Sequence, residues 1–345
     1  MYKGKTVAVV VPAHNEEKLI GTVLETMPDF VDLIIVVDDA STDHTSAIVA
    51  SYREHLGRRL LLTAHEKNQG VGATIVTGYK QALRSEIDVV AVMAGDAQMD
   101  PADLERLVEP IAQEEADYVK GNRLFRGESW EMIPHYRFLG NSLLSLLTKV
   151  ASGYWHIADS QCGYTAISRV ALERLNLDNI YKRYGMPNDI LVSLNVNNFR
   201  VHDVSVRPVY NVGEQSGIRL SKVIPTITWL LIRGFLWRLK EKYVIRDFHP
   251  LLFFYCMGLS LFPAGVMLGV YLLWYRIFIG TVATTSALFA AFLTISGLQT
   301  LFFAMWFDMD YNKHLKRTPT LQRPAQSDRE GDVDIRKHRA QSYGS

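Results

Sequence analysis

The sequence predicts an α/β domain followed by helices that associate with a membrane. Over the first third of the chain, short runs of apolar, mostly β-branched residues alternate with helical stretches. Such alternation is typical of a parallel sheet with helices on both faces. Near the C-terminal end, two long runs carry no charged residue. Each is long enough to cross the roughly 30 Å of hydrocarbon in a bilayer.

Composition narrows the class of protein. The chain has 345 residues, and 37 Lys and Arg against 36 Asp and Glu give a formal net charge of +1. This balance argues against nucleic-acid binding, because neutralising a phosphate backbone requires a basic excess. A hydrophobic share of 48% excludes general disorder. Cys162 and Cys256 are too few for a disulfide scaffold and lack metal-ligand spacing.

The elements of the α/β part follow in order. Short, continuously apolar runs indicate strands buried on both faces, and we expect them at residues 6–11, 33–37, 60–63 and 88–93. Helices are expected between and after them, near residues 16–27, 43–55, 71–84 and 101–114. Pro101 suits the first turn of its helix.

Polar loops follow three of these strands. They span residues 12–16, 38–43 and 95–100. Because ligands of doubly wound sheets bind outside the carboxyl ends of the strands, these loops are expected to form the site. The chain has neither a GxGxxG after the first strand nor a GxxxxGK[ST] string, which argues against a dinucleotide site and a P-loop.

The residue types in these loops suit a nucleotide bound with a cation. Asp38 and Asp39 are placed to accept hydrogen bonds from the ring N–H groups of a base. Asp96 and Gln98 offer oxygen ligands to a hard cation that neutralises a diphosphate. The alternative for each single aspartate is a helix N-cap, but three polar loops at successive strand ends are harder to explain as caps.

The loops resemble the motifs of a known family. The strings PAHNE (12–16), VDDASTD (37–43), NQGVGA (68–73) and GDAQ (95–98) resemble the family 2 glycosyltransferases, which have the GT-A fold with a Rossmann-like mixed sheet. QCGY (161–164), followed by a membrane hairpin, resembles the branch that transfers sugars to polyprenyl or dolichyl phosphate, such as dolichyl-phosphate mannose synthases. The resemblance covers about residues 5 to 250.

The resemblance assigns donor-binding roles to individual residues. Pro12 and Glu16 match the loop that lines the nucleoside site, and Asp39, with Asp38 beside it, matches the aspartate that holds the base. Asp96 matches the second aspartate of the D-x-D motif, and Gln98 matches the metal-side glutamine. Ala94 replaces the first aspartate of D-x-D, so one usual acidic contact is missing. The implied cofactor is a divalent cation, Mg²⁺ or Mn²⁺.

The resemblance also implies a site for the acceptor phosphate. The residues matched to it are Arg123, Arg137, Ser221 and Lys222. Lys222 and, more weakly, Arg219 are also matched to the donor diphosphate. Arg123, Arg137 and Asp96 are therefore expected to take part in catalysis. Arginine suits this task because its planar fork grips phosphate through two hydrogen bonds.

Asp189 leaves two interpretations open. Family members with hydroxyl acceptors place a catalytic base in this region, since a hydroxyl must lose a proton during attack. A lipid phosphate is already anionic and needs no base. The alternative, which we favour, is that Asp189 or Asn188 caps the helix that begins near Ile190, or that Asp189 has a positioning role.

The membrane segments predict the topology. Residues 251–275 and 277–307 are free of charge and separated by Arg276, which predicts a transmembrane hairpin. Basic residues before the first span and after the second place both ends, and with them the catalytic domain and both termini, in the cytoplasm. The implied location is the cell membrane, as a multi-pass protein.

The resulting domain organisation has four parts. We expect the GT-A domain at residues 1–215, amphipathic interfacial helices at 216–248, the transmembrane hairpin at 249–308 and a disordered cytoplasmic tail at 309–345. An amphipathic helix packed on the soluble domain is the alternative for the second part.

The function implied is the inverting transfer of a sugar from a UDP-hexose or GDP-mannose to dolichyl or undecaprenyl phosphate at the cytoplasmic membrane face. The partners are a nucleotide-sugar, a polyprenyl phosphate lipid and the membrane, with no nucleic acid; a homo-oligomer stays open. One alternative is a family 2 enzyme with a hydroxyl acceptor on a lipid or glycan. Another is a degenerate membrane-tethered module that only binds nucleotide-sugars, for which Ala94 is the motivation.

Overall fold

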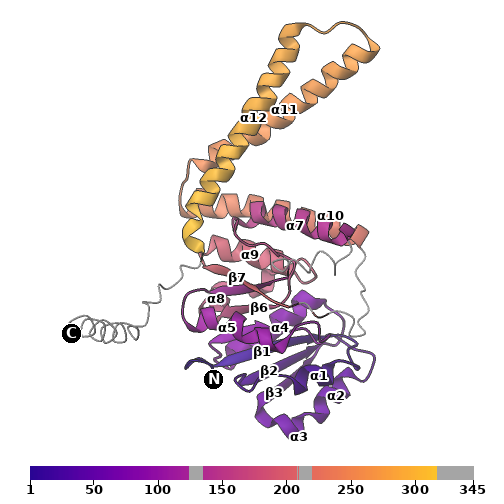
Figure 1. Cartoon of the computed structure of the whole chain (residues 1–345), viewed down its shortest axis with the longest axis vertical. Helices are drawn as coiled ribbons and strands as arrows, with labels where there is room; N and C mark the ends of the chain where they lie inside the picture. Colours follow the sequence, from indigo (N-terminus) through magenta and orange to yellow (C-terminus); the bar gives the residue numbers. More distant parts are fainter. Residues whose placement is uncertain (124–134, 208, 210–219, 317–345) are drawn as a thin grey trace, which may run out of the picture.

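The computed structural model describes residues 1–123, 135–207, 209 and 220–316. In this part of the chain a seven-stranded sheet has the order β3-β2-β1-β4-β6-β5-β7 (Figure 1). The strands are β1 (Val7–Ala13), β2 (Leu33–Asp38), β3 (Leu60–Ala64), β4 (Val89–Val92), β5 (Tyr118–Asn122), β6 (Thr165–Ser168) and β7 (Val201–Ser205).

The sheet is mixed. Strands β1 to β4 are mutually parallel where they pair, while β6 runs antiparallel to both β4 and β5. At the far edge, β5 pairs in parallel with β7. The four strands expected from the apolar runs are confirmed within two residues at each end. The mixed sheet is the one that the GT-A resemblance implies.

Helices cover both faces of the sheet. They are α1 (Ile20–Glu25), α2 (Thr45–Ser51), α3 (Arg53–Leu56), α4 (Val71–Arg84), α5 (Leu104–Ala112), α8 (Arg169–Arg174) and α9 (Met186–Val196). Short 3₁₀ turns are η1 (Gly57–Arg59), η2 (Pro101–Asp103) and η3 (Leu177–Asn179). As expected, Pro101 opens its turn, and the Asp100 side chain caps it by accepting from the Ala102 amide at 2.9 Å.

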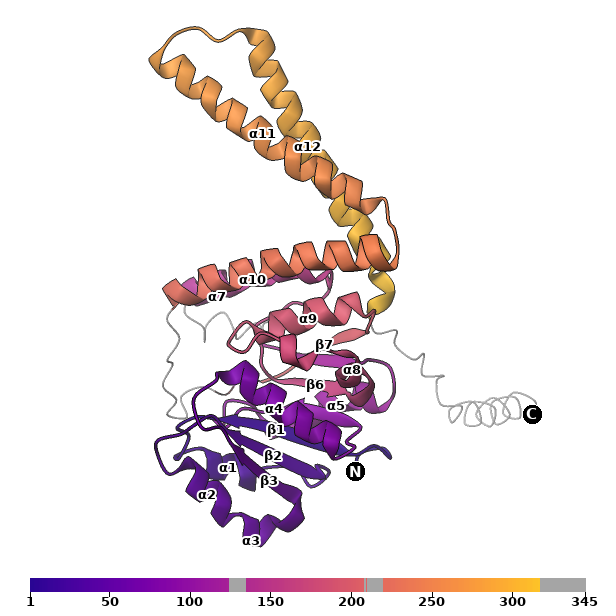
Figure 2. The ribbon, with the colours of Figure 1, turned by 180° about the vertical axis from the view of Figure 1, so that it is seen from behind.

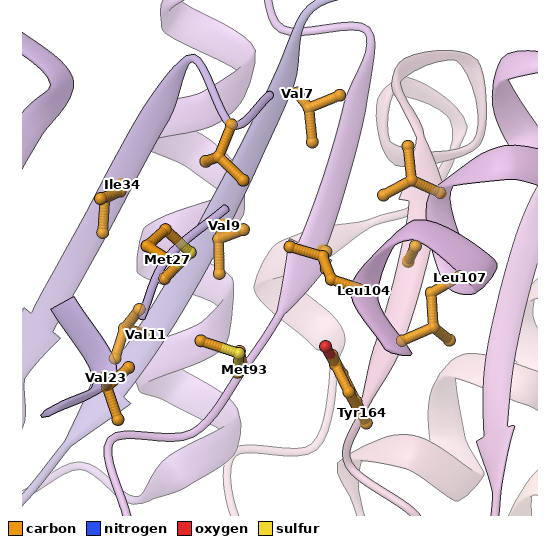
Figure 3. Close-up of a cluster of buried hydrophobic side chains, with 14 of the residues drawn as sticks. Val7, Val9, Val11, Val23, Met27, Ile34, Met93, Leu104, Leu107 and Tyr164 are labelled. Carbon is orange, nitrogen blue, oxygen red and sulfur yellow. The ribbon is translucent and has the colours of Figure 1, made fainter. Parts of the chain in front are cut away.

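The core forms on both sides of β1. Val7, Val9 and Val11 pack with residues of α1 and α5 on one face, as Figure 3 shows. Ala8 and Val10 pack with residues of α4 and α9 on the other. A strand buried on both faces needs the continuous apolar run that the sequence has, because no alternate position faces water.

Two long helices lie side by side between the α/β domain and the C-terminal hairpin (Figures 1 and 2). They are α7 (His135–Ser152) and α10 (Leu220–Lys240), and a π-helical turn, η4 (Glu241–Arg246), continues α10. Large apolar side chains of α10 are exposed, namely Ile224, Trp229, Ile232, Leu236 and Trp237. The uncovered part of α10 thus combines large apolar side chains with exposed Arg233 and Lys240, as expected for a helix at a membrane surface.

The hairpin consists of α11 (Leu251–Phe278) and α12 (Thr284–Tyr311), which project away from the α/β domain (Figure 2). Each is long and apolar enough to cross a membrane, and most of each helix is not covered by protein. Glycines bring the two helices close: a Cβ atom at Gly297 would lie 2.3 Å from the Phe262 backbone nitrogen. Small residues at such crossings are typical of helices that pack within lipid.

One boundary differs from our expectation. Residues 309–316, which we assigned to a disordered tail, form the last turn of α12 and a 3₁₀ turn, η5 (Lys313–Leu315). Lys316 then makes a β-bridge to Val201. The polar composition of residues 309–316 suggested disorder. These residues are ordered because Asn312 is buried and contacts Lys242, which is distant in sequence. The remainder of the predicted tail, 317–345, lies outside the described residues.

Candidate active site

The three strand-end loops interlock at one edge of the sheet. The Ala13 carbonyl accepts a hydrogen bond from the Asp39 amide at 2.9 Å, and the Pro12 carbonyl accepts one from the Gly95 amide at 3.1 Å. The loop after β1 therefore lies between the loops after β2 and β4. The structure brings these motifs together as the parallel order of the strands predicts.

Each of the three loops holds one non-glycine residue in the left-handed region of backbone space. These residues are Asn15 (φ 59°), Ala40 (φ 57°) and Ala97 (φ 55°). An alanine in this conformation costs roughly 1 kcal/mol and has no polar side chain to offset it. Backbone strain of this kind gathers at functional sites, where the surrounding structure enforces it.

Asp38 and Asp39 are both buried but hold different partners. Asp38 accepts hydrogen bonds from the amide of Ser41 at 3.0 Å and from the hydroxyls of Ser41 and Ser46, so its carboxylate organises its own loop. Its predicted contact with a base therefore competes with these hydroxyls. Asp38 acts first as the anchor of the 38–46 segment.

Asp39 organises the loop that leads into α4. Its Oδ1 atom accepts from the His65 ring at 2.8 Å and from the Gln69 amide at 2.9 Å, and its Oδ2 atom accepts from the Gly70 amide at 2.8 Å. Burial acts to raise the pKa of Asp39, but these donors outweigh it and hold the pKa below its usual value. Oδ2 has one further lone pair, which suits the ring N–H of a base.

Carboxyl groups from different loops lie close enough at this edge to influence one another electrostatically. Burial and the nearby charges of Asp96 and Asp43 raise the pKa of Glu16 to about 7. Asp43 itself is held by the Thr45 hydroxyl at 2.6 Å and amide at 3.0 Å at the start of α2. A cation bound near Glu16 and Asp96 would offset the repulsion between their charged forms.

The donor set fits a cation that is shared with a diphosphate. Asp96 offers a carboxylate, and Gln98, whose amide donates to Asp96 Oδ1 at 3.1 Å, offers a side-chain oxygen from the same loop. Mg²⁺ and Mn²⁺ prefer such hard oxygens and are commonly bound by one or two carboxylates together with substrate phosphates. Within the described residues no cluster of three His, Cys, Asp or Glu side chains forms a closed metal cage.

The predicted phosphate ligand Arg123 is held by a carboxylate that the sequence did not reveal. Asp159, whose side chain is buried, accepts from Arg123 Nε at 2.8 Å, from Nη2 at 3.2 Å and from the Arg123 amide at 3.3 Å. Burial opposes ionisation of Asp159, but the Arg123 guanidinium keeps its pKa below the usual value. The forked contact fixes the plane of the guanidinium.

A short segment joins the two halves of the site. The hydroxyl of Tyr164 donates to the Asp100 carbonyl at 3.0 Å, next to the predicted metal loop. Buried Lys120 donates to the Cys162 carbonyl in the same segment. Burial lowers the pKa of Lys120, while the charge of Asp159 acts in the opposite direction. Residues 159–164, which include the QCGY string, therefore connect the donor loops with Arg123.

The capping interpretation of Asp189 is wrong, because α9 begins at Met186 rather than near Ile190, its N-cap residue is Gly185, and Asp189 lies inside the first turn. Its Oδ2 atom accepts from the Tyr181 amide at 2.8 Å. The segment from Tyr181 to Lys182 packs on the start of α4, where the Lys182 carbonyl accepts from the Ala73 amide at 3.1 Å. Burial raises the pKa of Asp189. These contacts support a positioning role, and a catalytic role stays untested.

The remaining predicted site residues are placed only by their backbone or not at all. Arg137 lies in the first turn of α7, and Ser221 and Lys222 lie in the first turn of α10; their side chains are outside the described part of the structure. Arg219 is outside the described residues. Val209, which precedes α10, donates its amide to the Gln98 carbonyl at 3.2 Å.

A mixed sheet of this strand order, with carboxylates at its strand ends, is typical of glycosyltransferases of the GT-A type. The sequence profile described as glycosyl transferase family 2 matches residues 8–175. A UDP-N-acetylglucosamine–dolichyl-phosphate N-acetylglucosaminyltransferase from Methanococcus voltae is 30% identical over 218 residues, which cover 60% of this chain and 86% of the relative. The chain therefore belongs to glycosyltransferase family 2.

Other relatives carry related names. A dolichyl-phosphate beta-glucosyltransferase from Trichomonas vaginalis is 27% identical over 70% of this chain and 76% of its own length. A polyprenol monophosphomannose synthase from Mycolicibacterium smegmatis is 26% identical over 66% of this chain and 87% of its own length. These relatives, like the first, are named as transferases of sugars to polyprenyl phosphates.

A solved structure shares the fold. Glucosyl-3-phosphoglycerate synthase from Mycobacterium tuberculosis, in complex with Mn²⁺, UDP and phosphoglyceric acid, aligns with a TM-score of 0.50 at 20% identity. The alignment covers 68% of this chain and 78% of that protein. It confirms the glycosyltransferase fold expected from the sequence.

Proposed function

We propose that this chain transfers a sugar, with inversion, from a nucleotide-sugar to a polyprenyl phosphate at the cytoplasmic surface of a membrane. The interlocked loops bind the donor, and a basic site formed by Arg123 and the first turns of α7 and α10 binds the acceptor phosphate. Its family membership and the names of its relatives support this assignment.

The observation that carries the acceptor site is the parallel alignment of α7 and α10. Arg238, near the end of α10, donates to the Ala151 carbonyl at 2.9 Å near the end of α7. Closer to the helix starts, Ile227 and Leu231 pack with Leu144. Both helices therefore begin at the same end of the pair, which brings the turns of Arg137 and Lys222 together.

That end of the helix pair is linked to the donor site. Helix α7 is the next described element after Arg123, and α10 is the next after Val209, whose amide binds the Gln98 carbonyl. In this proposal the two basic first turns meet the acceptor phosphate beside Arg123 and the 95–98 loop. The first turn of a helix also exposes unpaired N–H groups, which favour an anion.

The chemistry requires positioning and charge stabilisation. A lipid phosphate oxygen attacks the anomeric carbon, and the bond to the nucleoside diphosphate breaks with the electron pair going to the diphosphate. Two anions must approach, so the arginine and lysine groups offset repulsion and align the acceptor. A divalent cation at Asp96 and Gln98 would supply charge neutralisation for the leaving diphosphate.

The exposed charges support the cytoplasmic orientation. Of the five Lys and Arg residues between positions 233 and 248, Arg238 and Lys242 are buried and do not face lipid head groups. The remaining three, Arg233, Lys240 and Arg246, are exposed, as are Lys313 and Lys316 after α12. The far end of the hairpin has only Arg276, in the last turn of α11, so the basic excess stays on the side of the catalytic domain.

A donor screen tests the proposal. Purified protein in liposomes receives a polyprenyl phosphate, a divalent cation and, in turn, radiolabelled UDP-N-acetylglucosamine, UDP-glucose and GDP-mannose. The expected result is label in an organic-extractable lipid that mild acid hydrolyses, as a sugar phosphate ester should. Label in an acid-stable lipid would indicate a hydroxyl acceptor, and saturable UDP binding without product in any arm would indicate a binding module.

A further inference from the structure

The membrane hairpin joins the rest of the protein through buried polar side chains. Asp308 lies in the last turns of α12 and Asn312 just after it, and both are buried. The preceding part of the helix carries no charged residue. A carboxylate withdrawn from water requires charged and hydrogen-bonding partners, so this end of the hairpin is built to meet specific groups on the body of the protein.

The main partner of Asp308 is Arg238 on α10, which is also fully buried. Arg238 Nη1 donates to Asp308 Oδ1 at 2.8 Å, and Nη2 donates to Oδ2 at 3.0 Å. Tyr243 also donates to Oδ1, and Trp155 Nε1 donates to Oδ2 at 3.3 Å. Two segments of the body, the continuous helix α10–η4 and the residues after α7, therefore hold one carboxylate of the hairpin.

The same guanidinium extends the connection to α7. Arg238 Nε donates to the Ala151 carbonyl at 2.9 Å, and Nη2 donates to the Val150 carbonyl at 3.0 Å. These carbonyls lie in the last turn of α7, where the helix provides no further N–H partner. One side chain thus connects α7, α10 and α12.

Lys242 forms a second connection, between α9 and α12. Its Nζ atom donates to the Asn195 carbonyl at 2.9 Å, to Asn195 Oδ1 at 3.0 Å and to Asn312 Oδ1 at 2.8 Å. Asn195 Nδ2 also donates to Asn312 Oδ1 at 3.0 Å. Helix α9 belongs to the α/β domain, so the hairpin is attached to the domain as well as to the helix pair.

The energetics favour a role in orientation. Removing two charges from water costs about as much as their attraction returns, so an apolar pair of similar volume would stabilise the fold as well or better. A forked arginine–carboxylate contact instead imposes direction, because both oxygens must face both nitrogens. It fixes the rotation of α12 about its axis and its depth relative to α7 and α10.

We propose that Arg238 and Asp308 are positioning residues for the transfer reaction. They hold the membrane hairpin at a set orientation against α7 and α10, so that the basic first turns of those helices meet the phosphate of a lipid embedded in the bilayer. The inference rests on the proposed function, because it assumes a polyprenyl phosphate acceptor. Neither residue touches the reacting groups.

The test compares an embedded acceptor with a soluble one. Asp308→Asn keeps the volume but removes the charge. Asp310→Asn on the same helix is the matched control, since Asp310 is exposed and pairs with exposed Lys313. For a long polyprenyl phosphate in liposomes we expect Asp308→Asn to lower kcat/KM by roughly tenfold or more, mainly through KM. For a short, water-soluble prenyl phosphate the change should stay within about twofold.

A second variant separates orientation from folding. The double replacement Arg238→Met with Asp308→Leu restores packing without the forked contact, and UDP binding by calorimetry reports an intact α/β domain. We expect this variant to bind UDP normally and to show the same loss toward the embedded acceptor alone. Equal losses on both acceptors, or no loss in either variant, would overturn the inference. If the unmodified protein makes no lipid product at all, the proposed function fails instead.

Discussion

Arg123 and Asp159 form a forked ion pair in which the carboxylate is buried and the guanidinium is partly exposed, at 1% and 29% of their side-chain surfaces. This asymmetry places the carboxylate in the interior and leaves part of the Arg123 side chain accessible to solvent. An arginine held in this way is preorganised for a phosphate, since less side-chain freedom is lost on binding.

Replacing Asp159 by Asn should therefore affect both stability and transfer. The change removes the partner of Arg123, and we expect the free energy of unfolding to fall by about 2–4 kcal/mol. Transfer should fall by roughly tenfold or more because Arg123 loses its fixed orientation. The control is Asp117→Asn, which breaks a similar fork with Arg200 at a more exposed position and should cost at most about 1 kcal/mol. Similar behaviour of the two variants would contradict the assignment.

The donor site provides a second test, because Asp38 and Asp39 are neighbours with different partners. Asp39→Asn turns an N–H₂ group toward the amides of Gln69 or Gly70, which now donate to the carboxylate. We expect UDP binding, measured by calorimetry, to weaken roughly tenfold or more. Asp38→Asn should lower thermal stability with a smaller effect on affinity. If Asp39→Asn binds UDP as tightly as the unmodified protein, Asp39 does not accept a hydrogen bond from the base.

The metal loop can be tested by adding a ligand as well as by removing one. Asp96→Ala should abolish cation-dependent transfer, because Asp96 is the carboxylate of the 95–98 loop. Ala94→Asp supplies the acidic group that the family motif usually has, and we expect the Mn²⁺ concentration for half-maximal activity to fall several-fold. Asp100→Asn is the control, since the Asp100 side chain caps η2. An unchanged metal requirement in Ala94→Asp would show that position 94 does not face the cation.

Glu16 predicts how stability depends on pH in the absence of metal. Its pKa is raised from 4.5 to about 7, so between these values the folded protein keeps a proton that the unfolded chain has lost. The free energy of unfolding should therefore fall as pH rises through this window. Because Glu16 is only half-buried, solvent screening reduces the effect to about 1–2 kcal/mol.

Chemical denaturation between pH 4.5 and 8 measures this effect. Glu16→Gln should remove the decline, whereas Glu17→Gln, at an adjacent exposed site, should leave it in place. Added Mn²⁺ should also flatten the decline by favouring the ionised form. An identical pH profile for the unmodified protein and Glu16→Gln would contradict the raised pKa.

The sequence predicted those parts of the site that follow from local patterns. Strand-end loops could be located because buried strands are continuous apolar runs, and parallel strands end at one edge. The role of Asp159 could not be predicted, because its partner Arg123 lies 36 positions away. The residues next to Asp159 in the sequence also do not indicate that its side chain is buried. Asp308 was hidden for the same reason, since it is 70 positions from Arg238. Charge partners across long separations are set by tertiary packing.

The junction of Arg238 with Asp308 has a consequence for protein engineering. A chimera that joins an unrelated two-helix anchor to this catalytic domain would leave Arg238 buried without its carboxylate partner. Such a graft would need an acidic residue at the matching turn of its second helix. The hairpin of this enzyme is therefore specific to its catalytic domain. Replacing the hairpin would require replacing the residues that bind Asp308 as well.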